Sequence, residues 1–107
     1  MKSLAEALSP EEIDIGRCSL RATIEGSFFP DWEFETLIGA NHAEVREVYA
    51  AWPRRTVGQE AFRSIVFNSM ANLIGYPHGK EEELIAYIPR GRAAIVELLD
   101  RLTTLGV

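Results

Sequence analysis

The chain has 107 residues, of which 47% are hydrophobic and 25% charged, and its formal net charge at pH 7 is −5. These values indicate one domain, spanning residues 1–107, that buries a core of its own. They exclude a disordered chain and also a disulfide framework, since Cys18 is the single cysteine. The N-terminus lacks the apolar stretch of a signal peptide and no run is as long as a membrane span, so we expect a cytoplasmic protein without membrane contact.

The first predicted helix begins at Pro10. Ser9 and Glu12 have the spacing of a capping box, and proline suits the first helical position. Gly26 is expected to end this helix in the left-handed conformation.

Residues 17–25 can be interpreted in two ways. Polar and apolar residues alternate strictly there, which is typical of a strand, but the same segment also continues a helical apolar stripe. The corresponding segment of the second half, residues 60–74, has a clear helical pattern. We therefore predict a helix for residues 17–25.

Two shorter helices follow in the first half. A helix is predicted over residues 30–38, with Gly39 as its stop, because proline and acidic residues occupy its first turn. Asn41 and Glu44 then form a second capping-box pattern, and Pro53 ends the helix that they begin.

The second half follows the linker 54–58 and has the same order of elements. A long helix is predicted over residues 59–74 and a short one over residues 80–88. The last helix is expected to begin at Pro89 and to end near Gly106.

The two halves resemble each other at an offset of 50 residues. The matching apolar pairs are Phe34 and Leu84, Leu37 and Tyr87, Ile38 and Ile88, Val45 and Ile95, Val48 and Leu98, and Trp52 and Leu102. We therefore predict an all-α fold of about six helices. They would form two units of a long, a short and a medium helix, over residues 10–53 and 57–104, related by pseudo-twofold symmetry around one core.

The two halves differ in charge. Residues 1–53 hold four basic and ten acidic side chains, a net charge of −6, whereas residues 54–107 hold seven basic and six acidic ones, a net charge of +1. An acidic surface attracts basic partners and repels phosphate backbones. We expect a small, non-enzymatic protein-binding domain, of the inhibitor type, that binds a basic protein or a second copy of itself. The predicted partner-binding residues are Phe29, Asp31, Trp32, Glu33, Glu35, Glu44 and Glu47.

The alternative function is DNA binding. Residues 34–49 resemble a helix-turn-helix, but their second helix exposes Glu44 and Glu47 beside a single arginine, which does not suit contacts with phosphate. In this alternative, the DNA contacts would come from Asn41, Arg46, Arg90 and Arg92.

Nothing in the sequence predicts a catalytic residue, a cofactor or a metal site. Cys18, His42 and His78 lack the spacing of metal ligands, and no phosphate-binding loop is present. Asn68 and Asn72 lie one helical turn apart, where asparagine is unfavourable. We expect their side chains to bond a neighbouring turn.

Overall fold

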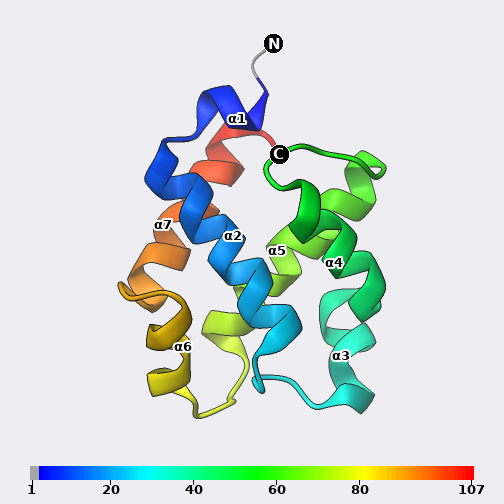
Figure 1. Cartoon of the computed structure of the whole chain (residues 1–107), viewed down its shortest axis with the longest axis vertical. Coiled ribbons are helices and arrows are strands. Elements are labelled where there is room, and N and C mark those ends of the chain that lie inside the picture. The colour runs from blue at the N-terminus through cyan, green and yellow to red at the C-terminus, as the bar shows by residue number, and fades with distance from the viewer. Residues whose placement is uncertain (1–2) are drawn as a thin grey trace.

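The computed structural model describes residues 3–107, and this part of the chain is all-helical, with seven α-helices and no β-strand. Figure 1 shows their arrangement. The helices are α1 (Leu4–Ala7), α2 (Pro10–Glu25), α3 (Asp31–Ile38), α4 (His42–Ala51), α5 (Gln59–Gly75), α6 (Glu81–Tyr87) and α7 (Arg92–Leu105). The all-α prediction is confirmed, and residues 17–25 are helical, as predicted.

The expected count of about six helices was wrong because it left out α1. This helix has only four residues, so apolar periodicity has no room to develop. A capping box holds it: the Glu6 backbone N–H donates to Ser3 Oγ over 3.3 Å, and Glu6 Oε1 accepts from the Ser3 backbone N–H over 3.4 Å. The Ser-x-x-Glu spacing at residues 3–6 was therefore the signal that could have revealed it.

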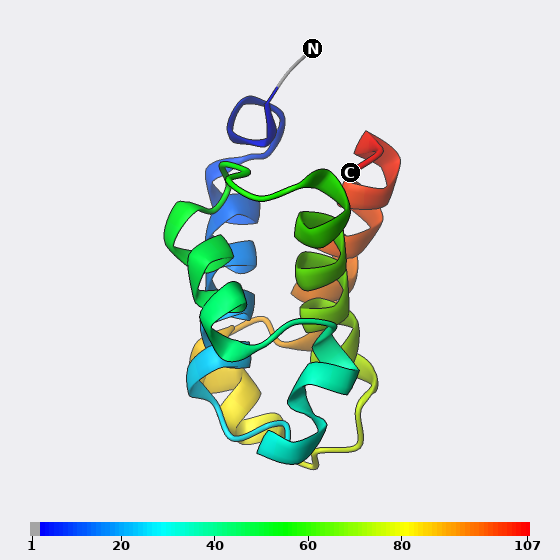
Figure 2. The ribbon, with the colours of Figure 1, turned by 90° about the vertical axis from the view of Figure 1, so that its right-hand side faces the viewer.

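Two long helices, α2 and α5, form the centre of the molecule. They contact each other, α2 also contacts α4, α6 and α7, and α5 also contacts α3, α4 and α7. Figure 1 shows α6 and α7 on one side of this central pair and α3 and α4 on the other. The view in Figure 2 faces α3 and α4. All the outer helices therefore bury their apolar faces against one shared core.

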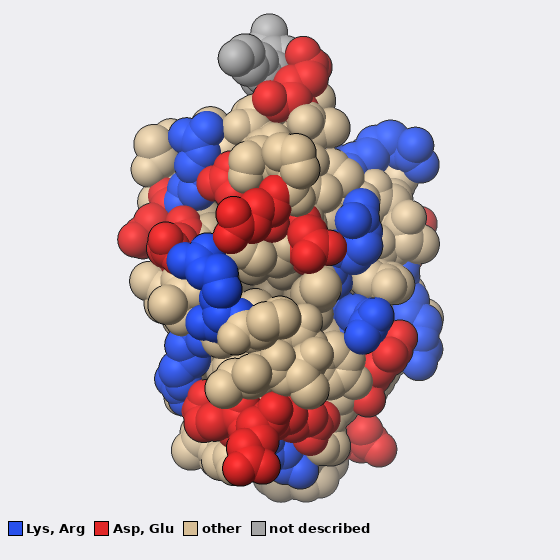
Figure 3. Space-filling view, turned by 60° about the vertical axis from the view of Figure 1, so that its left-hand side comes forward, with Lys and Arg blue, Asp and Glu red and all other residues tan. Residues whose placement is uncertain are grey.

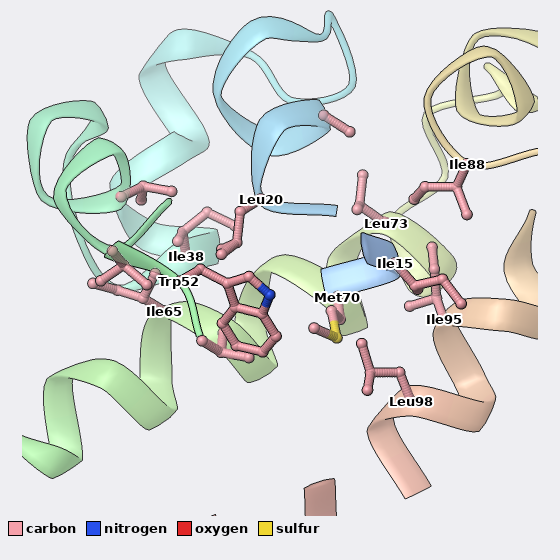
Figure 4. Close-up of a cluster of buried hydrophobic side chains, with 14 of the residues drawn as sticks. Ile15, Leu20, Ile38, Trp52, Ile65, Met70, Leu73, Ile88, Ile95 and Leu98 are labelled. Carbon is pink, nitrogen blue, oxygen red and sulfur yellow. The ribbon is translucent and has the colours of Figure 1, made fainter. Parts of the chain in front are cut away.

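Trp52 closes this core at the end of α4. Its side chain is 3% exposed, its indole N–H donates to the Ile13 carbonyl over 2.8 Å, and its ring stacks on Phe62 with centroids 6.1 Å apart. Figure 4 shows the indole among buried aliphatic side chains. The ring lies against Gly16, where an added Cβ would come within 2.2 Å of Trp52 Cζ2. The missing side chain at Gly16 is what lets α4 pack on α2.

The amide groups of Asn68 and Asn72 hold the end of α3. Asn68 Nδ2 donates to the Ile38 carbonyl over 2.9 Å, and Asn72 Nδ2 donates to the Leu37 carbonyl over 3.0 Å. The last carbonyls of a helix have no partner within it, so these bonds replace water at a partly buried helix end. The prediction that both side chains bond a neighbouring turn is confirmed.

Two predicted helix ends differ from the structure. Gly26 follows α2 with φ −75°, an extended rather than a left-handed conformation. The last helix begins at Arg92, not at Pro89, because Pro89 and Arg90 lie in a turn that Gly91 completes with φ +65°. The Gly91 N–H closes this turn by donating to the Ile88 carbonyl over 2.7 Å. Within the described residues, no helix has the length and apolar composition needed to cross a membrane.

We expect Gly16→Ala to lower the free energy of unfolding by about 1–3 kcal/mol, because the new methyl group would displace the buried indole. Chemical denaturation measures this change. The matched control is Gly75→Ala at the end of α5, where an added Cβ meets nothing within 4 Å, and its effect should stay within about 0.5 kcal/mol. Equal effects of the two substitutions would contradict this account of the Gly16–Trp52 contact.

We expect Asn72→Ala to lower the free energy of unfolding by about 1–2 kcal/mol, because the Leu37 carbonyl loses its partner at a partly buried site. Hydrogen exchange should also become faster in α3. Thr104→Ala is the control, since that exposed hydroxyl bonds only to the Asp100 carbonyl of its own helix, over 2.9 Å. An unchanged exchange rate in α3 would show that the amide does not hold this helix.

Candidate partner-binding surface

Trp32 is the most exposed large hydrophobic side chain of the described residues, at 80% exposure. It lies in the first turn of α3. Phe34 and Ile38 turn to the core and are buried, and the helical period then places Trp32 and Glu35 on the outer side. The next most exposed, Ile85 on α6, reaches 51%. This exposure makes the outer side of α3 a candidate surface.

The carboxylates beside Trp32 are not neutralised. Asp31 and Glu35 are exposed, and neither makes an ion pair or a side-chain hydrogen bond within residues 3–107. Glu33 accepts a hydrogen bond of 2.8 Å from the Tyr76 hydroxyl, which also raises the pKa of that hydroxyl. α3 itself carries no basic residue, so its acidic side chains have no cationic neighbour on their own helix.

The two acidic residues predicted on α4 have different roles. Glu44 completes a capping box, as its Oε1 accepts from the Asn41 backbone N–H over 2.9 Å. Glu47 is exposed and has no ion-pair partner in the described part of the chain. Figure 2 shows α3 and α4 on the same face. Glu47 is next to the exposed Arg46 in α4, whereas Glu44 is bonded to its own helix end.

Phe29 does not lie on this surface. Its side chain is 9% exposed, and its ring packs edge-on against Tyr76, with centroids 5.7 Å apart. It also lies 6.3 Å from the Phe28 ring. The expectation that Phe29 contacts a partner does not fit this burial, because the apolar connector before α3 folds into the core.

A cavity of about 600 Å³ adjoins the N-terminal end of α3. Its walls are the connector 26–31, residues 76–78 and Lys80, and we call it the connector cavity. Asp31 lines it directly beside Trp32. Sequence reasoning missed this cavity, because its two walls come from segments about 50 residues apart whose approach depends on how α2 and α5 pack.

Hydrogen bonds join the two walls of the connector cavity. Glu83 accepts from the Ser27 backbone N–H over 2.9 Å and from its hydroxyl over 2.7 Å, and Lys80 Nζ donates to Ser27 Oγ over 3.1 Å. The hydrogen bond from the Ser27 backbone N–H lowers the pKa of Glu83, and the bond from the Ser27 hydroxyl lowers it further. His78 is held at both ring nitrogens: Nδ1 accepts from the Lys80 N–H and Nε2 donates to the Leu73 carbonyl, each over 2.9 Å. These contacts make the cavity a preformed feature.

The residues of the DNA-binding alternative are mostly engaged within the chain. Arg90 pairs with Glu11 over 2.9 Å and with Glu97, while Arg92 binds both oxygens of Glu81. These carboxylates raise the pKa of both arginines. Figure 3 shows the resulting mixture of positive and negative groups on the face that carries α6 and α7.

Asn41 and Arg46, on the other hand, lie on the opposite side of the molecule from Arg90 and Arg92, with α4. Asn41 Oδ1 accepts from the Glu44 N–H over 2.9 Å as the cap of that helix. Arg46 is exposed. The four predicted DNA-contacting residues are therefore not brought together on one face.

The groups capable of nucleophilic or metal chemistry are dispersed. Burial, with a smaller effect from Asp14, raises the pKa of the Cys18 thiol, which disfavours the reactive thiolate. The His42 ring stacks on Phe34, with centroids 3.7 Å apart. Among residues 3–107 no three His, Cys, Asp or Glu side chains come together in a group that could hold a metal ion. Comparison with protein-family models, curated proteins and solved structures finds no significant match to this chain.

The hydrogen bonds to Glu83 predict a pH effect on stability. Because folding lowers the pKa of this carboxyl, its contribution to stability is present above the unfolded pKa and is lost as pH falls through the folded one. We therefore expect the stability difference between the wild type and Glu83→Gln to be largest near pH 6 and to shrink towards pH 3.

Denaturation at each pH measures this difference. Ser27→Ala removes one of the two donors, so a double-mutant cycle with Glu83→Gln should give a coupling energy that also declines with acid. A coupling energy that stays constant with pH would contradict the assignment of the effect to Ser27 and Glu83.

Proposed function

We propose that this protein is a non-enzymatic protein-binding domain whose acidic N-terminal half docks a basic segment of a partner on α3. The observation that carries the proposal is the 80% exposure of Trp32 between the unpaired carboxylates of Asp31 and Glu35. Tryptophan is enriched among the few interface residues that supply most of the binding energy. Carboxylates around an aromatic anchor select a positively charged partner and speed its approach.

The local structure supports this role in two ways. The acidic residues occupy the first turn of α3, where the helix dipole favours negative charge, so the free protein tolerates them without cationic neighbours. The connector cavity adjoins Asp31 and provides about 600 Å³ for a side chain of the partner. A lysine or arginine entering it would meet the Asp31 carboxylate at its edge.

We also propose that the fold consists of the two predicted units. Residues 50 positions apart share the same burial in both halves, as seen for Ile15 and Ile65, Ser19 and Ser69, Leu20 and Met70, Phe34 and Leu84, and Val45 and Ile95. Phe28, which is buried, and His78, which is half-buried, are also 50 positions apart, and their rings meet edge to face with centroids 4.9 Å apart. A pseudo-twofold axis passing near this contact would account for these observations.

The hydrogen bonds between the connectors and the short helices support the same arrangement. Glu33 of α3 binds Tyr76, which follows α5, and Glu83 of α6 binds Ser27, which follows Gly26 at the end of α2. Each short helix thus reaches the connector of the other half from an equivalent position.

We expect Trp32→Ala to abolish capture of the partner by the immobilised protein, with a loss of affinity of about 30-fold or more, as is usual for a tryptophan at the centre of an interface. Lysate proteins that the wild type retains and the variant does not are identified by mass spectrometry, purified and titrated by calorimetry. Glu35→Lys should weaken the same binding, and added salt should release the partner.

The matched control is Ile85→Ala, which removes an exposed apolar side chain from the other half. It should retain the same partner as the wild type. Retention by Trp32→Ala would contradict the proposed surface. Sedimentation of the pure protein tests whether the partner is instead a second copy of the chain. A dimer that Trp32→Ala dissociates would show that the surface on α3 binds another copy and not a basic protein.

DNA binding is the less supported function, because the ion pairs of Arg90 and Arg92 would have to break before either guanidinium met a phosphate.

A further inference from the structure

A second cavity, of about 710 Å³, lies at the end of the molecule where α1, the linker after α4 and the start of α5 meet. We call it the end cavity. Figure 1 shows these segments at the opposite end from α3, so the site is independent of the proposed function. Cavities of about 300–1,000 Å³ are the size that holds small molecules, and such sites combine apolar walls with a few polar groups.

The walls of the end cavity are mainly apolar. Leu4 and Ala5 come from α1, Pro53 from the linker and Phe62 from α5. Phe62 is 2% exposed and stacks on Trp52, so this wall is continuous with the core and rigid. A ligand lying here would cover hydrocarbon surface, which favours an apolar tail.

The polar part of the lining is positively charged. Arg54 and Arg55 line the cavity, both are exposed, and no ion pair of either is present in the described residues. Among residues 3–107, no Asp or Glu side chain lines it. Val107 lines the cavity as well, and its carbonyl oxygen accepts a hydrogen bond from Arg63.

Three other arginines of the second half are different. Arg90, Arg92 and Arg101 each pair with a carboxylate of this chain. Two adjacent guanidinium groups that lack such a partner, beside an apolar cavity, match a ligand that supplies the missing anion.

We infer that the end cavity binds a single-chain anionic amphiphile, such as a medium-chain fatty acid. Its hydrocarbon tail lies against Leu4, Ala5 and Pro53, and its carboxylate binds Arg54 and Arg55. The volume accommodates one chain, and charge complementarity selects an acid over an alcohol or an amine of the same length.

Trp52 provides the signal for the test, because its indole stacks on the Phe62 ring that lines the cavity. The chain has two tryptophans, so Trp32→Phe leaves Trp52 as the single emitter. This variant is titrated with decanoate, decanol and decyltrimethylammonium. We expect a saturable change in Trp52 emission with decanoate, a weaker one with decanol and none with the cation, and calorimetry detects binding that leaves emission unchanged.

Single substitutions then identify the acid-binding groups. In the Trp32→Phe background, Arg54→Gln and Arg55→Gln should each raise the Kd of decanoate roughly tenfold, while the Kd of decanol stays the same. Arg46→Gln removes the same charge from α4, outside the cavity, and should leave both values unchanged. Thermal unfolding verifies that each variant remains folded.

Three results would overturn the inference: no saturable binding of decanoate, equal affinity for decanoate and decyltrimethylammonium, or unchanged decanoate affinity in both arginine variants. Vesicles of dioleoylphosphatidylglycerol form a separate arm. Binding to the vesicles without binding to decanoate would assign the arginines to a bilayer surface, and would also overturn the proposal of a soluble ligand.

Discussion

The packing of Trp52 against Gly16 is the constraint on which the rest of the arrangement depends. The indole joins three helices: it follows α4, touches α2 at a residue without a side chain, and stacks on Phe62 of α5. Its N–H is satisfied by the Ile13 carbonyl, so the buried polar atom carries no desolvation penalty. Phe62 of the same stack is also one of the residues that line the end cavity. The Trp52–Phe62 pair therefore contributes both to the packing of the core and to the lining of the end cavity.

The second organising feature is that some charged side chains have a partner of opposite charge and others have none. Arg90, Arg92 and Arg101 in the second half are each matched by a carboxylate, whereas Asp31, Glu35 and Glu47 in the first half have no cationic partner within residues 3–107. Exposed pairs contribute little to stability, so the matching is chiefly a matter of which charges stay available to other molecules. By this criterion the available negative charges include Asp31, Glu35 and Glu47, and the available positive charges include Arg46, Arg54 and Arg55.

The sequence predicted those elements whose signals are local. The capping boxes at Ser9 and Asn41, with the apolar stripes that follow them, are formed as expected, because the side chains that make them lie within one helical turn. Asn68 and Asn72 were also interpreted correctly, since a mid-helix asparagine needs a partner outside its helix. Tertiary contacts decided the remainder. Phe29 was expected at the surface, but the connector folds inward against Tyr76, and both cavities form between segments far apart in sequence.

The way each short helix is held has a consequence for unfolding. The end of α3 is capped by Asn68 and Asn72 of α5, and Glu83 of α6 binds Ser27 in the connector that follows α2. Neither half contains the groups that complete its own short helix, so loss of one half deprives the other of these contacts. We therefore expect the two halves to unfold together, because each loses hydrogen-bond partners when the other unfolds. A single cooperative transition follows from the exchange of contacts between the halves.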